Sequence, residues 1–118
     1  MFEIDIQVEQ EGEQYTDLLR GAIEATLQHE QVAPPASVVL LLTDDAQLRQ
    51  LNLTYRGYDK STDVLSFTDG EAPFPDAPVH LGDIAISLPQ AMRQADEKKG
   101  GISAELQLLA THGTLHLL

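Results

Sequence analysis

The chain has 118 residues, a formal net charge of −12 and no cysteine. This length fits one domain, residues 1–118, with a core of its own, and the missing cysteine excludes disulfides and thiolate metal ligands. The net charge argues against broad, charge-driven nucleic-acid binding, so a nucleic-acid enzyme would have to gather its few cations in one place. No stretch approaches the roughly 20 apolar residues of a membrane span and no basic-then-apolar leader opens the chain, so we expect a cytoplasmic protein.

The first half of the chain predicts alternating strands and helices. Residues 2–9 alternate apolar and polar side chains, which indicates a half-buried strand. Residues 14–30 repeat apolar side chains at helical spacing and predict an amphipathic helix. Residues 37–42 form a continuous aliphatic run, typical of a strand buried on both faces. Thr43 is placed to cap a second helix that ends near Arg56.

The second half predicts two strands and then two helices. Strands are expected over residues 62–67 and 79–87, separated by a surface loop that holds three prolines. Ser87 is placed to cap the third helix, and Ser103 the last one. The element order predicts an α+β fold in which a mixed four-stranded sheet is packed with helices.

Two histidines near the end of the chain suggest a metal site. His112 and His116 are four residues apart, so on a helix they lie on one face, where both imidazoles can reach one ion. Glu105 and Leu109 share that face. Because the helix is apolar on most sides, we expect it to be buried and its histidines to need partners, which a metal could supply. The alternative is a pair of structural core histidines.

The residue after the first histidine bears on the reaction type. Metalloproteases with His-Glu-x-x-His place a general-base glutamate there, whereas this chain has Gly113, which counts against peptide hydrolysis. A glycine in a helix is unfavourable by about 1 kcal/mol relative to alanine. Gly113 therefore indicates either close approach of another backbone or room for substrate, or else simple packing.

Four other polar side chains are candidates for supporting roles. Arg56 could grip a phosphate with its guanidinium fork, or it could be a solvated arginine at a helix end. Lys60 could extend a phosphate-binding patch or be a solvated loop lysine. Glu105 could orient a ligand imidazole or be a plain carboxylate near the start of its helix. Asp63 is expected to fix the loop through backbone hydrogen bonds.

Three motifs together resemble the YbeY family of bacterial metal-dependent endoribonucleases, which act in ribosomal RNA maturation. Residues 52–67 resemble its Asn-x-x-Tyr-Arg…Thr-Asp-Val-Leu-Ser-Phe signature, and residues 82–87 resemble its Gly-Asp-Ile-x-Ile-Ser strand. Residues 112–118 resemble the opening of its His-Gly-x-Leu-His-Leu-x-Gly-Tyr-Asp-His box. The matches stand in the family's order, and Arg56 matches the motif arginine.

The resemblance implies a zincin-like architecture and one zinc ion held by three histidines. His112 and His116 match the first two ligands, and the chain ends before the third, so we expect a form shortened within the metal-binding box. His29 and His80 match no family ligand position. The Lewis acidity of zinc on neutral imidazoles can lower the pKa of bound water towards ~7.

The function implied is that of a zinc-dependent, single-strand-specific endoribonuclease in ribosomal RNA processing and ribosome quality control. Its expected partners are ribosomal RNA and ribosomal proteins. Two alternatives stay open at this point: a zinc hydrolase of peptides or small molecules, and a non-catalytic ribosome- or protein-binding module whose histidines are core residues.

Overall fold

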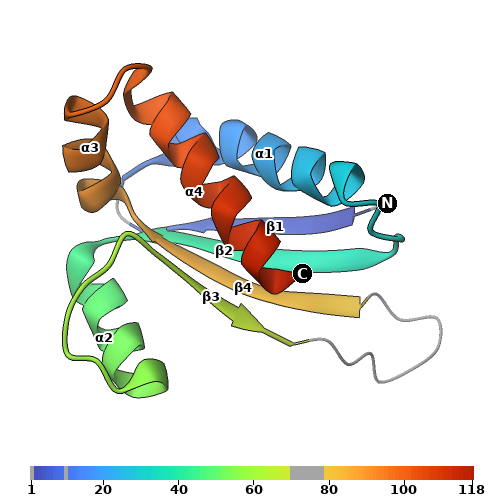
Figure 1. Ribbon diagram of the computed structural model, residues 1–118, viewed down its shortest axis with the longest axis horizontal. Coiled ribbons are helices and arrows are strands. Elements are labelled where there is room, and N and C mark those ends of the chain that lie inside the picture. Colours follow the sequence, from blue (N-terminus) through green and yellow to red (C-terminus); the bar gives the residue numbers. More distant parts are fainter. Residues whose placement is uncertain (1, 10, 70–78) are drawn as a thin grey trace.

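The computed structural model describes residues 2–9, 11–69 and 79–118 of the chain. Its strands, β1 (Phe2–Val8), β2 (Ala36–Thr43), β3 (Val64–Thr68) and β4 (Val79–Ser87), form one sheet in the order β1-β2-β4-β3. The pairs β1–β2 and β2–β4 are parallel, and β3 runs antiparallel to β4 along one edge (Figure 1). This arrangement confirms the predicted α+β fold with a mixed four-stranded sheet.

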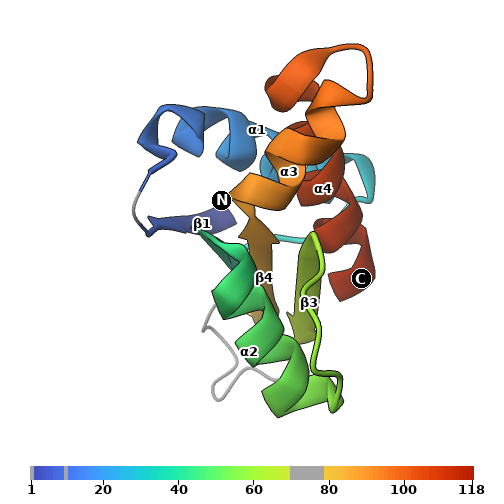
Figure 2. The same cartoon turned by 90° about the vertical axis from the view of Figure 1, so that its left-hand side faces the viewer.

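The helices divide unequally between the two faces of the sheet. Helices α1 (Thr16–His29), α3 (Leu88–Asp96) and α4 (Gly101–Leu117) lie on one face, and α2 (Asp45–Arg56) lies on the other (Figure 2). A short 3-10 turn, η1 (Glu13–Tyr15), leads into α1. No helix among these described elements is long and apolar enough to cross a membrane.

The core lies between the sheet and the three-helix layer. Because side chains alternate across a strand, Val38, Leu40 and Leu42 of β2 point into this core and are fully buried. Between them, Val39 and Leu41 face the side that carries α2 and are only half-buried. The prediction that residues 37–42 are buried on both faces is therefore wrong, because α2 alone does not cover the second face.

Several local predictions can be compared with the structure. Ser87 does cap α3, since its hydroxyl accepts a hydrogen bond from the backbone N–H of Gln90 at 3.3 Å. Thr43 instead ends β2, and the carboxylate of Asp44 caps α2. Ser103 does not cap the last helix either, because α4 already begins at Gly101. The predicted proline loop falls on residues 70–78, outside the described residues.

Helix α4 is buried along a single stripe. Leu106, Ala110 and Leu117 pack into the core, whereas Leu108 and Leu115 are 52% and 43% exposed. The expectation of a helix buried on most sides is wrong, because α4 has the sheet beneath it and α1 and α3 beside it, and none of the described residues covers its outer side.

Candidate active site

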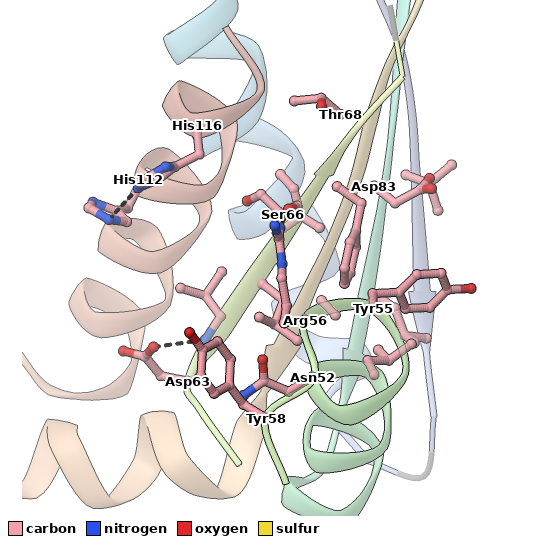
Figure 3. Close-up of a pocket in the computed structure, with 18 of the residues that line it drawn as sticks. Asn52, Tyr55, Arg56, Tyr58, Asp63, Ser66, Thr68, Asp83, His112 and His116 are labelled. Carbon is pink, nitrogen blue, oxygen red and sulfur yellow. Dashed lines mark hydrogen bonds between the residues drawn. The ribbon is translucent and has the colours of Figure 1, made fainter. Parts of the chain in front are cut away.

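A cleft of about 1140 Å³ runs along the edge strand β3, where the two faces of the sheet meet. Its walls come from the end of α2, from β3 and β4, and from the last turns of α4 (Figure 3). The polar side chains that line it include Asn52, Arg56, Asp63, Ser66, Asp83, His112 and His116. Two of the predicted motifs and the histidine pair thus meet in one place, although they are far apart in the sequence.

Arg56 reaches the cleft from the last residue of α2. Gly57 follows with φ +77° and ends the helix there, in a backbone conformation that glycine adopts without strain. The Nη2 of Arg56 donates a hydrogen bond to the backbone carbonyl of Ser66, and its guanidinium carbon lies 5.2 Å from the ring centroid of Phe67. The guanidinium is thereby held over the outer edge of β3, with other donors left for a ligand.

Ser66 is the residue that joins the two sides of the cleft. Just outside the two ends of β3, the carbonyl of Asp63 and the N–H of Asp69 hydrogen-bond to β4. Because such bonding alternates along an antiparallel strand, Ser66 turns its backbone groups to the free edge. Its carbonyl accepts from Arg56, and its hydroxyl donates to the carbonyl of Gly113 at 3.0 Å. One serine therefore links α2 to the turn of α4 that carries the histidines. Sequence reasoning missed this role, although Ser66 lies within the Thr-Asp-Val-Leu-Ser-Phe motif.

His112 and His116 lie one turn apart on α4 and point to the same region (Figure 3). Their Nε2 atoms are 2.9 Å apart, and their ring centroids are 4.5 Å apart. Both side chains are exposed at the cleft, so the expectation of buried histidines is wrong. The reason is geometric: the buried stripe of α4 passes through Gly113 and Leu117 and leaves the histidines on its flank.

Gly113 holds this turn close to the sheet. A Cβ atom at this position would lie 2.9 Å from the Cγ2 of Ile84 and 3.3 Å from the Oγ of Ser66. The close approach is made by side chains of β3 and β4, and Gly113 itself is buried. Of the readings left open for this glycine, packing against the sheet is therefore the one the structure supports.

The histidine pair fits a metal ion in donor type and direction. Two imidazole nitrogens bound to one tetrahedral zinc at 2.0–2.1 Å would be separated by roughly 3.3 Å, so the observed 2.9 Å requires only a small ring adjustment. No group of three or more His, Cys, Asp or Glu side chains among the described residues is placed to hold a metal. The pair would supply two ligands to such an ion.

The loop between α2 and β3 is fixed by two polar side chains. Asn52, which is buried in α2, donates from Nδ2 to the backbone carbonyl of Lys60 at 2.9 Å. The carboxylate of Asp63 accepts from the N–H of Val64 at 2.8 Å, as predicted for a loop-fixing residue. Lys60 does not line the cleft; its Nζ lies 5.6 Å from the ring centroid of Tyr58.

Glu105 is not placed beside the histidines. Its side chain is 2% exposed, accepts a hydrogen bond from Gln94 at 2.6 Å and pairs with the Nζ of Lys98 at 3.0 Å. These contacts join α3 to α4, so Glu105 neither touches an imidazole nor acts as a simple carboxylate at a helix start. The sequence pattern could not reveal this, because Gln94 and Lys98 belong to the preceding helix and turn.

The two remaining histidines also lie apart from the pair. His29 is highly exposed and contacts the carboxylate of Glu30. His80 bridges neighbouring strands, with Nδ1 2.9 Å from the Oγ of Ser37 and Nε2 3.0 Å from a carboxylate oxygen of Asp83. Neither histidine lines the cleft that holds His112 and His116.

Arg49 and Arg93, which do not line the cleft, are paired with carboxylates. The hydrogen bond and charge of Arg49 lower the pKa of Asp59. Burial raises the pKa of Asp45, but hydrogen bonds from Ser87 and Arg93 outweigh this effect and leave that pKa lowered. Arg56, by contrast, has no carboxylate partner among the described residues, which keeps its charge available to an anionic ligand.

Comparison with known proteins agrees with these observations. A family model described as Endoribonuclease YbeY matches residues 3–118. A protein of that name from Roseiflexus sp. (strain RS-1) is 50% identical over 122 residues, which cover 98% of this chain and 76% of the relative. Another, from Moorella thermoacetica, is 46% identical over 115 residues, covering 91% and 73% of the two chains.

A solved structure shows the same fold. The solution structure of TM1509 from Thermotoga maritima matches with a TM-score of 0.65 and 26% sequence identity, covering 99% of this chain and 71% of the other. The relatives place this protein in the class of endoribonucleases, which are hydrolases that act on RNA. Within that class, the chain belongs to the Endoribonuclease YbeY family.

Proposed function

We propose that the cleft along β3 is a zinc-dependent active site that cleaves single-stranded RNA in ribosomal RNA processing and ribosome quality control. The observation that carries this proposal is that Arg56, His112 and His116 line the same cleft, Arg56 from the end of α2 and the histidines from α4. A cation suited to phosphate and a pair of metal-ligand imidazoles are the parts that phosphodiester hydrolysis uses. Ribosomal RNA and ribosomal proteins as partners and a cytoplasmic location complete the proposal.

The chain's own residues divide the work. Arg56 binds the phosphate through the guanidinium donors that Ser66 does not occupy, and it offsets the charge that builds up in the transition state. His112 and His116 would hold the zinc ion, which would supply a Lewis acid and a water of lowered pKa. Ser66 and Gly113 fix the distance between the two groups through their hydrogen bond.

The peptide-hydrolase alternative has no support in the cleft. Gly113 follows His112 where metalloproteases carry their general-base glutamate, and it packs against Ile84. Glu105, the buried carboxylate of α4, is paired with Lys98.

Substitution of Arg56 tests the proposal. The family's box continues with Gly-Tyr-Asp-His, so the chain lengthened by these four residues is incubated with zinc and labelled single-stranded RNA, duplex RNA or a peptide. We expect cleavage of single-stranded RNA alone, and Arg56→Ala should reduce it at least ~100-fold with bound zinc unchanged.

The matched control is Arg49→Ala. Arg49 lies on the same helix but is paired with Asp59 and does not line the cleft, so its loss should leave cleavage unchanged. Cleavage of the peptide, or equal RNA cleavage by Arg56→Ala and the unsubstituted protein, would contradict the proposed function.

A further inference from the structure

Two exposed tyrosines flank Arg56 in the cleft. Tyr55 and Tyr58 are 66% and 60% exposed, and both line the same cleft as the histidine pair. In the view of Figure 3, Arg56 lies between their rings, with Tyr58 on the side of Asp63. Tyrosine normally buries much of its ring. Two open rings beside Arg56 therefore indicate a ligand with an apolar face.

Each ring has one close neighbour among the described residues and remains largely exposed. Tyr55 packs against Phe67, with ring centroids 5.1 Å apart and planes inclined by 56°. Lys60 places its Nζ 5.6 Å from the centroid of Tyr58, and the loop that carries both is held by the bond from Asn52 to the carbonyl of Lys60. The tyrosines are thus positioned by their neighbours in the absence of a ligand, which reduces the entropy lost on binding.

The local charge favours a nucleic acid over other aromatic-binding partners. Most cations of the described chain are paired with carboxylates: Arg20, Arg49, Arg93 and Lys98. Arg56 and Lys60, which adjoin the tyrosines, have no such partner among the described residues. In a protein with a net charge of −12, two cations without carboxylate partners in the described chain thus adjoin two open rings, in a cleft that Asp63 and Asp83 also line. Single-stranded nucleic acids are bound by this combination of cations and stacking aromatic side chains.

We infer that Tyr55 and Tyr58 form a stacking site for the unpaired bases of RNA on either side of the phosphate bound by Arg56. This inference rests on the proposed function, and it names the feature by which the cleft would select single strands. A base within a duplex is stacked on its neighbours and cannot offer its face to either ring, whereas an unpaired base can.

The test compares two probes of equal charge. One is a fluorescently labelled 2′-O-methyl decaadenylate, and the other is a decamer of abasic residues with the same phosphates. Binding to the unaltered chain is measured by fluorescence anisotropy at several salt concentrations. We expect the base-bearing probe to bind about 10-fold more tightly than the abasic one, since stacking on one aromatic residue contributes about 1–3 kcal/mol.

The variants separate stacking from charge. Tyr55→Leu and Tyr58→Leu should each reduce the preference for the base-bearing probe several-fold and leave the salt dependence unchanged, and Tyr→Phe at either position should retain it. Arg56→Gln should weaken the binding of both probes alike and make the affinity less dependent on salt concentration. The control is Leu53→Ala, an exposed position on α2 that does not line the cleft, and it should change neither quantity.

Three results would overturn the inference, in two distinguishable ways. Equal binding of the two probes, or a preference that survives both leucine substitutions, would remove the stacking site and leave RNA binding by Arg56 intact. No binding of either probe would remove the inference together with the proposed function.

Discussion

The two faces of the sheet are built from the same strands and have opposite properties. On one face, α1, α3 and α4 close over β2 and β4 and bury Leu40 and Ile84 almost completely. On the other, α2 stands alone and leaves Val39 and Leu41 half-buried in the cleft. A single strand can therefore serve stability with one set of alternate residues and line a binding site with the other.

The edge strand β3 belongs to both regions. Val64 packs towards the core beneath α4, while Phe67 supports Tyr55 and Arg56 on the face of α2. Between them, Ser66 bonds to Arg56 on one side and to Gly113 on the other. The groups proposed to act on a phosphodiester thus meet only at the strand around which the two faces join.

Two neighbouring leucines test the contrast most strongly. Leu40→Ala should lower the free energy of unfolding by about 3–4 kcal/mol, because it opens a cavity in a fully buried region. Leu41→Ala should lower it by only ~1 kcal/mol, because this side chain already borders the cleft. Urea denaturation of both variants measures the difference, and equal losses would show that the second face is as closed as the first.

Glu105 tests whether the first turns of α4 are structural. Glu105→Ala removes the partner of Gln94 and Lys98 between α3 and α4, and should lower the free energy of unfolding by about 2 kcal/mol. Bound zinc, measured on the folded variant of the lengthened chain, should not change. Loss of zinc without loss of stability would instead give Glu105 the ligand-orienting role that its position on the helix suggested.

Gly113 tests how closely the two sides of the cleft must approach. Gly113→Ala places a Cβ against Ile84 and should cost about 1–2 kcal/mol of stability, despite the higher helix propensity of alanine. The added Cβ would push this turn of α4, with both histidines, away from β3. The rate of RNA cleavage by the lengthened chain should therefore fall even under conditions where the variant is fully folded. A variant as stable as the unsubstituted protein would show that α4 can retreat from the sheet freely.

Asp45 provides the smallest expected effect, one that depends on pH. Its pKa in the folded chain is lowered, so its contribution to stability is present above the unfolded value of about 3.9 and is lost as the pH falls through the folded value. Asp45→Asn should therefore cost about 1 kcal/mol at pH 7 and progressively less below pH ~4. Urea denaturation at each pH measures the difference in the free energy of unfolding between Asp45→Asn and the unsubstituted protein. A difference that stays constant from pH 7 to pH 3 would contradict this role of Asp45.

The parts of the fold that could be predicted are those set by neighbouring residues. The alternation in β1, the cap by Ser87 and the four-residue spacing of the histidines depend only on local geometry. The failures at α4 and Glu105 have a common cause in long-range packing, whereas the caps assigned to Thr43 and Ser103 are errors in local helix boundaries. Which sides of α4 are covered depends on α1, α3 and the sheet, and the partners of Glu105 come from another helix.

The candidate site shows the same division. Residue type and spacing made Arg56, His112 and His116 candidates but left structural roles open, and the resemblance to the YbeY motifs favoured the functional ones. That all three line one cleft depends on the antiparallel placement of β3. Asn52 and Ser66 each donate a hydrogen bond to a backbone carbonyl that is distant in the sequence, and this role cannot be predicted from their residue types. The open tyrosines were likewise invisible in the sequence, because exposure is a property of the folded chain.

The most direct test of the central claim is the metal content of the chain lengthened by Gly-Tyr-Asp-His, measured by mass spectrometry beside the unlengthened chain. We expect about one zinc ion per lengthened chain, and its loss in His112→Asn and in His116→Asn with the fold retained. Zinc bound equally well by both histidine variants, or absent from the lengthened chain, would show that the pair on α4 is not a metal site.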